Sequence, residues 1–259
     1  MLDQLTRVVV DVGIQIAERR FELLINPNWR CNQIKTQADR YAHRCLVERL
    51  TKLEPIPIIS EEDTIGHGLQ RPDRYWLIDP IDGTASLAKG YEGWVVQAAL
   101  IYKNEPLLGA IFAPDLDLVY TAQKGLGAFV NKKRLLLNDI VQDRRTLIDN
   151  YPEPRGIAAE AMVAISCTNY LESGSISLKI CRVADGTADI FLKDVVVRDW
   201  DVAAPMVVLK EAGGFISKLD GSEFELVGDI EKNGILVSSS DKLHQEIRKF
   251  SNSRIADFP

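Results

Sequence analysis

The stretch RYWLIDPIDGT, residues 74–84, joins an apolar run to a segment that carries two aspartates. Its first five residues are largely aromatic or aliphatic, which predicts a buried strand. Asp-Pro and Asp-Gly are common turn dipeptides, so a surface turn is the simplest interpretation of the remainder. The alternative is a functional site. Pro80 restricts the backbone after Asp79 and Gly83 allows a close backbone approach, so that Asp79 and Asp82 could bend toward one point.

Composition and charge limit the functional classes open to the chain. Its 259 residues are 46% hydrophobic and 26% charged, which is typical of a soluble globular protein with one large domain or two smaller ones. The formal net charge of −6 argues against a surface for a nucleic-acid polymer, since such surfaces are basic. The apolar run at 8–17 is interrupted by Asp11, unlike a signal peptide or a membrane-spanning helix. We therefore expect a cytoplasmic protein that does not contact a membrane.

Cysteine and histidine are scarce. The four cysteines and three histidines show none of the spacings of a structural zinc site, and the cysteines are few for a disulfide scaffold. No histidine stands near a serine or cysteine in a recognisable catalytic arrangement. Acid–base chemistry in this protein should therefore rest on carboxylates or on metal-bound water.

Hydrophobic periodicity predicts two helices followed by a meander of strands. The helices are 4–24 and 38–50, and the strands are 56–60, 74–78, 94–102, 105–114 and 116–123. From about residue 160, strands alternate with helices. The predicted strands there are 162–166, 189–192, 214–218 and 234–239, and the predicted helices are 175–186, 201–214 and 241–250. The pattern indicates an α/β half packed on an α+β half, with a polar boundary at 138–158 and hence domains at 1–145 and 146–259.

Carboxylates follow two of the predicted strands. Glu61 and Glu62 come directly after 56–60, and Asp79 and Asp82 follow 74–78. If these strands are neighbours in one sheet, the acids converge and repel one another unless they take up protons or bind cations. Carboxylate oxygens suit Mg²⁺ or Mn²⁺, and the lack of His and Cys in these segments disfavours zinc.

Two further features would complete such a site. Asp201 stands at the start of a predicted helix, where it either joins the acids or simply caps free backbone N–H groups. Thr84 offers a hydroxyl, and the backbone N–H groups of Gly83 and Thr84 could receive a phosphate. The pattern therefore indicates a site for metal ions and an oxyanion.

Three segments resemble the motifs of the inositol monophosphatase superfamily of Mg²⁺-dependent, lithium-sensitive phosphatases. They are SEED at 60–63, WLIDPIDGT at 76–84 and WDVAAPMVVLKEAGG at 200–214. The resemblance extends over essentially the whole chain. It implies an α+β fold, a layered α-β-α-β-α sandwich of the inositol monophosphatase/fructose-1,6-bisphosphatase type.

The resemblance also implies a role for individual acids. Glu61 would bind the metal that activates water, and Asp79 would bridge metals. Asp82 and Asp201 would hold a second metal, with the backbone carbonyl of Ile81 as a further ligand. Two or three Mg²⁺ ions are implied, with Mn²⁺ as a substitute.

The family's water-activating pair of Thr and Asp corresponds to Thr84 and to Asp39, which lies in TQAD at 36–39. For Asp39, a place near the start of a helix is the competing interpretation. The residues with implied substrate contacts are Asp82, Gly83, Thr84, Gly174, Ser175 and Asp201. The implied reaction is hydrolysis of a phosphate monoester by in-line attack of a metal-bound water, without a covalent intermediate.

Different segments of the sequence resemble family branches that act on different phosphate esters. PIISEED, RYWLIDPIDGT, the Ala-Pro of IFAPDLDLVYTA and SLKICRVADG more closely resemble the 3'(2'),5'-bisphosphate nucleotidase branch, which acts on 3'-phosphoadenosine 5'-phosphate. Gly174-Ser175 instead follows the inositol monophosphatase pattern, and Lys193 and Arg198 are candidates for binding a second phosphate. We expect a small phosphorylated metabolite as substrate and regard a homodimer as compatible with the resemblance. A non-catalytic regulatory protein that has kept the fold is the remaining alternative.

Overall fold

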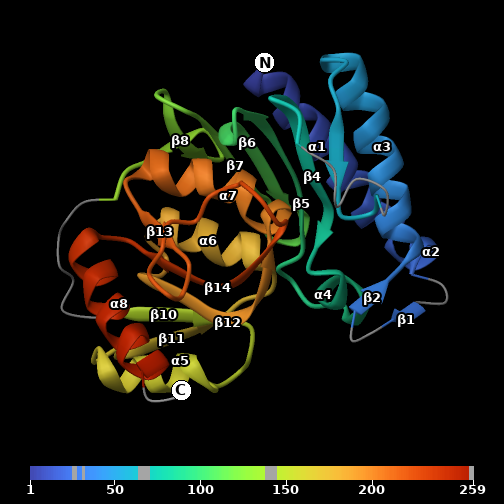
Figure 1. Cartoon of the computed structure of the whole chain (residues 1–259). Coiled ribbons are helices and arrows are strands. Elements are labelled where there is room, and N and C mark those ends of the chain that lie inside the picture. Colours follow the sequence, from blue (N-terminus) through green and yellow to red (C-terminus); the bar gives the residue numbers. More distant parts are fainter. Residues whose placement is uncertain (25–27, 31–32, 64–70, 138–144, 257–259) are drawn as a thin grey trace.

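The chain folds into alternating layers of helix and sheet (Figure 1). The computed structural model describes residues 1–24, 28–30, 33–63, 71–137 and 145–256. Within these residues, no helix is both long and apolar enough to cross a membrane.

The larger sheet has seven strands in the order β3-β4-β5-β6-β7-β8-β9. Their bounds are β3 Ile58–Ser60, β4 Arg74–Asp82, β5 Val95–Tyr102, β6 Glu105–Ala113, β7 Leu118–Gln123, β8 Gly127–Val130 and β9 Lys133–Leu135. β3 runs parallel to β4, with Ser60 opposite Ile78, and the other neighbours are antiparallel. The two acid-terminated strands are therefore neighbours in one sheet, which is the condition for their acids to converge.

The second sheet has five strands in the order β11-β10-β12-β14-β13. Their bounds are β10 Thr146–Asp149, β11 Asn169–Glu172, β12 Ile190–Arg198, β13 Phe215–Ser217 and β14 Glu231–Ser238. A separate pair, β1 Asn28–Arg30 and β2 Gln33–Lys35, forms an antiparallel ribbon. The short helical elements are α2 Arg20–Leu23, α4 Thr84–Lys89 and the 3₁₀ turn η1 Pro114–Leu116.

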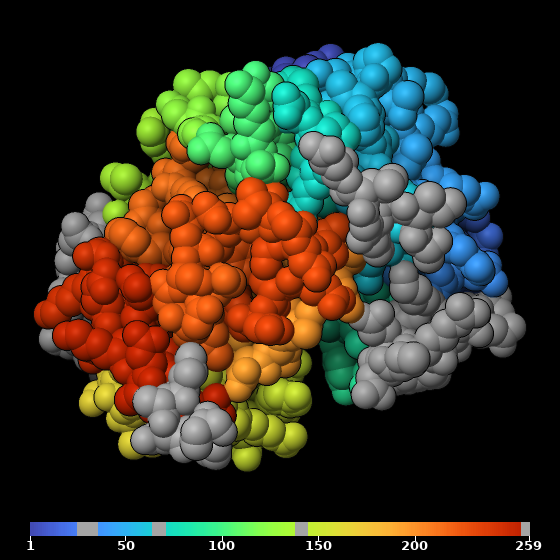
Figure 2. All heavy atoms as spheres, viewed as in Figure 1, coloured from blue at the N-terminus to red at the C-terminus, as the bar shows by residue number. Residues whose placement is uncertain are grey.

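Six longer helices complete the layers. α1 (Leu2–Glu18) and α3 (Gln37–Leu53) cover the outer face of the seven-stranded sheet. α6 (Ile176–Ala184) and α7 (Asp199–Ala212) lie between the sheets, and α5 (Ile157–Ala164) and α8 (Asp241–Ala256) cover the far face of the second sheet. In the space-filling view, red α8 and the blue N-terminal helices accordingly lie on opposite sides of the molecule (Figure 2). This arrangement confirms the α+β class and the α-β-α-β-α sandwich.

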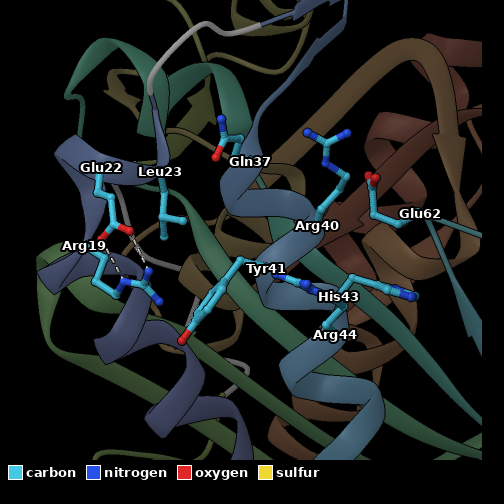
Figure 3. Close-up of a pocket in the computed structure, with 9 residues that line it drawn as sticks. All are labelled: Arg19, Glu22, Leu23, Gln37, Arg40, Tyr41, His43, Arg44 and Glu62. Atoms are coloured by element: carbon cyan, nitrogen blue, oxygen red, sulfur yellow. Dashed lines mark hydrogen bonds and ion pairs between the residues drawn. The ribbon is translucent and has the colours of Figure 1, made fainter.

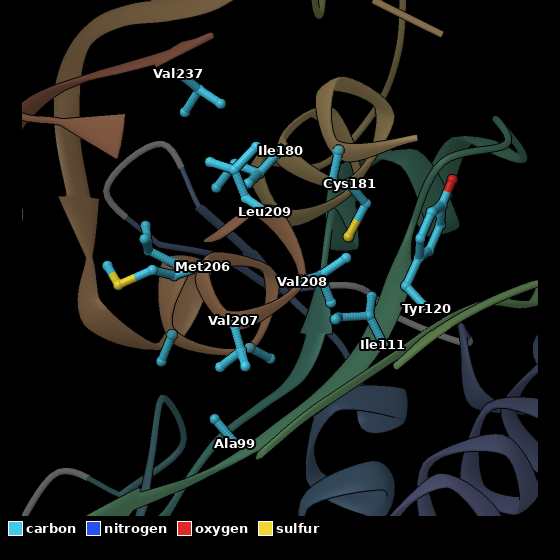
Figure 4. Packing of buried hydrophobic residues seen from close by; sticks show 14 of the residues in the cluster. Ala99, Ile111, Tyr120, Ile180, Cys181, Met206, Val207, Val208, Leu209 and Val237 are labelled. Atoms are coloured by element: carbon cyan, nitrogen blue, oxygen red, sulfur yellow. The ribbon is translucent and has the colours of Figure 1, made fainter. Parts of the chain in front are cut away.

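Each interface between layers has its own apolar core. Leu5, Val9, Val12 and Ile16 form a buried stripe on α1 at helical spacing, which packs on the first sheet. In the middle layer, α7 is apolar on nearly every side because sheets or helices surround it. Figure 4 shows Met206, Val207, Val208 and Leu209 of this helix packed with Ile111, Tyr120, Ile180, Cys181 and Val237. The buried middle layer fixes the start of α7, which carries Asp201.

The structure corrects three sequence predictions. Residues 162–166, predicted as a strand, lie in the end of α5 and the turn after it. Ala158, Ala161 and Ile165 are buried at helical spacing, and a short apolar run does not by itself distinguish a buried helix from a buried strand. The N-terminal helix, predicted as continuous over 4–24, is interrupted at Arg19 between α1 and α2.

The third correction concerns the polar boundary segment. Residues 146–149, assigned to it from composition, form β10 in the centre of the second sheet's parallel portion. Residues 138–144 lie outside the described part of the chain. The division into domains at 1–145 and 146–259 stays a prediction.

Candidate active site

The segment from Asp79 to Asp82 is a β-bulge in a buried strand. β4 continues through Asp82, and Asp79 lies opposite Gln97 whereas Asp82 lies opposite Val95 on β5. Three steps along β4 thus match two steps along β5, so β4 accommodates one extra residue. Residues three apart in a regular strand face opposite sides of a sheet, and the extra residue cancels this alternation. Both aspartates can therefore reach the same side, and the surface-turn interpretation of this segment is wrong.

Three carboxylates meet beside the bulge. One oxygen from each of Asp79, Asp82 and Asp201 lies within 4.8 Å of the others. Asp79 is 1% exposed, and Asp201 comes from the first turn of α7, where its Oδ2 accepts a hydrogen bond from the Arg198 backbone N–H at 2.8 Å. Asp201 thus caps the helix and joins the cluster, so both interpretations of this residue hold.

Burial and mutual repulsion raise the pKa values of the carboxylates in this cluster. Burial raises the pKa of Asp79 well above its usual value, and the charges of Glu61, Asp82 and Asp201 raise it further. Burial also raises the pKa of Asp201, with the charge of Asp82 as the next cause. At Asp82, burial raises the pKa while hydrogen bonds from Ser177 oppose the rise. Glu61 lies outside the group of three but is near enough to act on Asp79.

The donor set fits a hard divalent cation. All three groups offer carboxylate oxygens, which Mg²⁺ and Mn²⁺ prefer. Among the described residues, neither His nor Cys contributes to this group, which disfavours zinc. A cation held between the three side chains would also offset the repulsion that raises their pKa values.

Asp39 and Thr84 form a hydrogen-bonded pair next to the cluster. Asp39 lies in the first turn of α3, where its Oδ2 accepts from the Thr36 N–H at 2.6 Å and the Thr36 hydroxyl at 2.7 Å. Its Oδ1 lies 2.9 Å from Thr84 Oγ1, which is also 3.1 Å from the Ile81 carbonyl oxygen. The Thr84 hydroxyl has one hydrogen, so it donates to one of these oxygens at a time and keeps lone pairs for accepting. Asp39 therefore caps a helix and reaches the candidate site.

The segment around Gly83 packs closely against the Gly174–Ser175 loop. Gly83 has a φ of +91°, and a Cβ there would lie 3.2 Å from Ser175 Cβ. A Cβ at Gly174 would lie 2.3 Å from the carbonyl oxygen of Gly93, so only glycine fits. Ser175 is buried and its Oγ accepts from the Leu178 N–H at 3.1 Å, which caps α6. The loop predicted to contact substrate thus also has a structural role.

Ser177 and Gln97 belong to the site although neither was predicted as a site residue from the sequence. Ser177 donates to Asp82 Oδ2 from its backbone N at 2.8 Å and from its hydroxyl at 2.5 Å. Gln97 Nε2 donates to Ser177 Oγ at 2.5 Å and to the Trp200 carbonyl at 2.9 Å. The sequence does carry a signal for Gln97, which is the one polar residue in the interior of the apolar strand WVVQAALIY. A buried amide needs hydrogen-bond partners, so its position indicates a buried polar network. Lys179, also buried, donates to the Gly174 carbonyl at 2.5 Å, and burial lowers its pKa to about 8.

The two cations suggested for a second phosphate are paired within the protein. Lys193 Nζ lies 2.7 and 2.8 Å from the two oxygens of Asp149, which is 1% exposed. Arg198 Nη2 lies 3.0 Å from Glu231 Oε1. Either cation would have to exchange its carboxylate partner in order to bind a phosphate.

Comparison with known proteins gives a consistent assignment. The family model described as "Inositol monophosphatase family" matches residues 7–255. The "Putative Nus factor SuhB" of Neisseria meningitidis serogroup B is 28% identical over 93% of this chain and 97% of its own length. The "3'(2'),5'-bisphosphate nucleotidase CysQ" of Aggregatibacter actinomycetemcomitans is 35% identical over 71% of this chain and 72% of its own. The solved structure of an IMPase from Thermotoga maritima superposes with a TM-score of 0.84 at 25% identity, covering 100% of this chain and 99% of that one.

Proposed function

Because the chain belongs to the inositol monophosphatase family and is a phosphatase, we propose that it hydrolyses a small phosphate monoester with the help of Mg²⁺. The observation that carries this proposal is the convergence of Asp79, Asp82 and Asp201 within 4.8 Å. Glu61 and the Asp39–Thr84 pair complete the arrangement. The carboxylates would hold the metal, and Mn²⁺ is the expected substitute because it takes the same ligands.

The contacts of the site residues suggest a role for each of them in the hydrolysis. When bound, Mg²⁺ supplies Lewis acidity toward water and toward the phosphate oxygens. Thr84, when it donates to Asp39 Oδ1, has lone pairs with which to accept a hydrogen bond from the attacking water and so orient it. The network of Gln97 and Ser177 holds Asp82 in place, and Gly83, with its positive φ, lets the end of the bulge pack against the Gly174–Ser175 loop.

For the substrate we propose a 3'(2'),5'-bisphosphate nucleotide. The nucleotidase CysQ supports this choice, because its identity of 35% over 71% of this chain is higher, over a shorter stretch, than the 28% of the SuhB relative over 93%. An inositol monophosphate is the second candidate, and the pairing of Lys193 with Asp149 and of Arg198 with Glu231 favours it. A substrate with one phosphate would leave both ion pairs intact.

The test is phosphate release with Mg²⁺ from 3'-phosphoadenosine 5'-phosphate and inositol 1-phosphate in parallel, each with and without Li⁺. Asp82→Asn serves as the inactive control, and Asp117→Asn, at an exposed position, is its matched variant. A higher kcat/KM for the nucleotide supports the proposed substrate, and a higher value for inositol 1-phosphate favours the second candidate. Release from neither, with Mg²⁺ binding seen by calorimetry, would contradict both substrates and favour the non-catalytic alternative.

A further inference from the structure

A second cavity lies between α2 and α3, apart from the carboxylate cluster. Its volume is about 550 Å³, within the usual range for small-molecule sites and larger than the 470 Å³ and 260 Å³ cavities elsewhere on the protein. Figure 3 shows its lining residues, which are Arg19, Glu22, Leu23, Gln37, Arg40, Tyr41, His43, Arg44 and Glu62. None of these residues is among the side chains proposed to bind metal or substrate.

One wall of the cavity is held in place by contacts within the protein. Arg19 makes two hydrogen bonds to the carboxylate of Glu22, at 2.7 and 3.0 Å, and its guanidinium lies 4.6 Å from the centre of the Tyr41 ring. The Tyr41 hydroxyl in turn donates to Gln15 Oε1 at 3.0 Å. The charges of Arg19 and Glu22 offset each other, so this wall is ordered and close to neutral.

The other wall carries an excess of positive charge. Arg40 and Arg44 are exposed and stand one turn apart on α3, so their side chains share one face of the helix. Within the described part of the chain, neither makes a hydrogen bond or an ion pair. Glu62 supplies a single negative charge against these two guanidinium groups. This excess contrasts with the net charge of −6 on the whole chain.

We propose that this cavity is a second anion site, which binds a small phosphorylated molecule through Arg40 and Arg44. Guanidinium groups match phosphate oxygens in a planar, two-pronged geometry, and two of them one helical turn apart can share a phosphate or a diphosphate. The site adjoins the catalytic elements. Arg40 follows Asp39 on α3, and His43 Nδ1 lies 2.9 Å from the hydroxyl of Ser60, the residue before Glu61.

The alternative is an ordinary solvated helix face, on which exposed arginines are common. Calorimetric titration of the full chain with inorganic pyrophosphate, once with Mg²⁺ and once in EDTA, distinguishes the two. Anion binding at the carboxylate cluster depends on a divalent cation, whereas binding to arginines does not. The component that persists in EDTA therefore reports the cavity.

The decisive variant is Arg40→Ala/Arg44→Ala, with Arg7→Ala as the matched control. Arg7 is an exposed arginine on α1 that does not line the cavity. We expect the EDTA-resistant affinity to fall by at least about tenfold in the double variant and to be unchanged in the control, because only the former loses charge-assisted hydrogen bonds. Equal affinity of the parent and the double variant would overturn the proposal, as would the absence of any EDTA-resistant binding by the parent. These outcomes are independent of whether the carboxylate cluster hydrolyses the proposed substrate.

Discussion

Arg71 Nη2 lies 2.5 Å from Oδ2 of Asp199, a fully buried residue two positions before Asp201. Lys232 Nζ lies 3.5 Å from the other oxygen of Asp199. Arg71 also donates to the Leu226 carbonyl at 2.7 Å. The segment before β4, the start of α7 and the start of β14 therefore meet at one buried carboxylate. This ion cluster positions the turn of α7 from which Asp201 reaches the site.

Arg71→Ala should destabilise the protein and lower kcat together. Removing one partner of a buried pair leaves a charge poorly compensated, which typically costs about 3–5 kcal/mol. Urea unfolding measures the first effect, and phosphate release at saturating Mg²⁺ measures the second. Arg74→Ala is the control, because its partner Glu54 is partly exposed and such pairs contribute about 0–1 kcal/mol. Equal losses in the two variants would contradict a positioning role for Arg71.

Two substitutions of Asp201 separate its two roles. Asparagine keeps an oxygen that can accept from the Arg198 N–H, so Asp201→Asn should unfold near the parent's urea midpoint while losing most activity. Asp201→Ala removes the cap as well and should cost about 0.5–2 kcal/mol in addition. The comparison requires urea unfolding and phosphate release on the same samples. An active Asp201→Asn variant would rule out Asp201 as a metal ligand.

The hydroxyl of Thr84 should matter for turnover more than for stability. Thr84→Val removes the donor to Asp39 Oδ1 while keeping the side-chain volume, so we expect kcat to fall by about 10²-fold or more, the usual scale for a group that assists proton transfer. Thr84→Ser restores the hydroxyl and should recover much of the rate. Steady-state kinetics at saturating Mg²⁺ measures both. A valine variant as fast as the serine variant would remove Thr84 from the mechanism.

His244 should make stability fall between about pH 6.5 and 4. It is 5% exposed and lies between the hydroxyls of Ser238 and Ser217, at 3.0 and 3.1 Å. Burial lowers its pKa from the usual 6.5 to about 4. In this window the unfolded chain binds a proton that the folded protein does not. The free energy of unfolding therefore rises with pH by up to about 3 kcal/mol, and this contribution of His244 reaches its full value above pH 6.5.

His244→Gln should flatten that pH dependence, because glutamine can bond to serine hydroxyls without titrating. Chemical unfolding at a series of pH values measures the slope. Lys242→Gln, on an exposed position of the same helix, should keep the slope of the parent. Equal slopes in all three proteins would show that His244 does not control the acid limb of stability.

Local sequence patterns predicted the elements that carry the site. The runs at 56–60 and 74–78 were predicted as strands, and Ser60 and Ile78 pair in the neighbouring strands β3 and β4, which is the condition under which their acids converge. A helix was also predicted here from the acid-rich WDVAAP segment, with its start at 201, and α7 begins two residues earlier at Asp199. The wrong prediction at 162–166 has a local cause too. A short apolar run such as MVAIS is compatible with either a helix or a strand. The packing of α5 on the second sheet stabilises the helix.

The sequence by itself determined which carboxylates are available and which elements carry them, because hydrophobic period and turn chemistry are properties of neighbouring residues. Only the tertiary structure decided the bulge at Asp79–Asp82, since the extra residue exists only relative to the register of β5. It also decided the partner of Asp82, because Ser177 is 95 positions away along the chain. Contacts at such separation depend on how two sheets and the helices between them pack, and no local pattern carries that information.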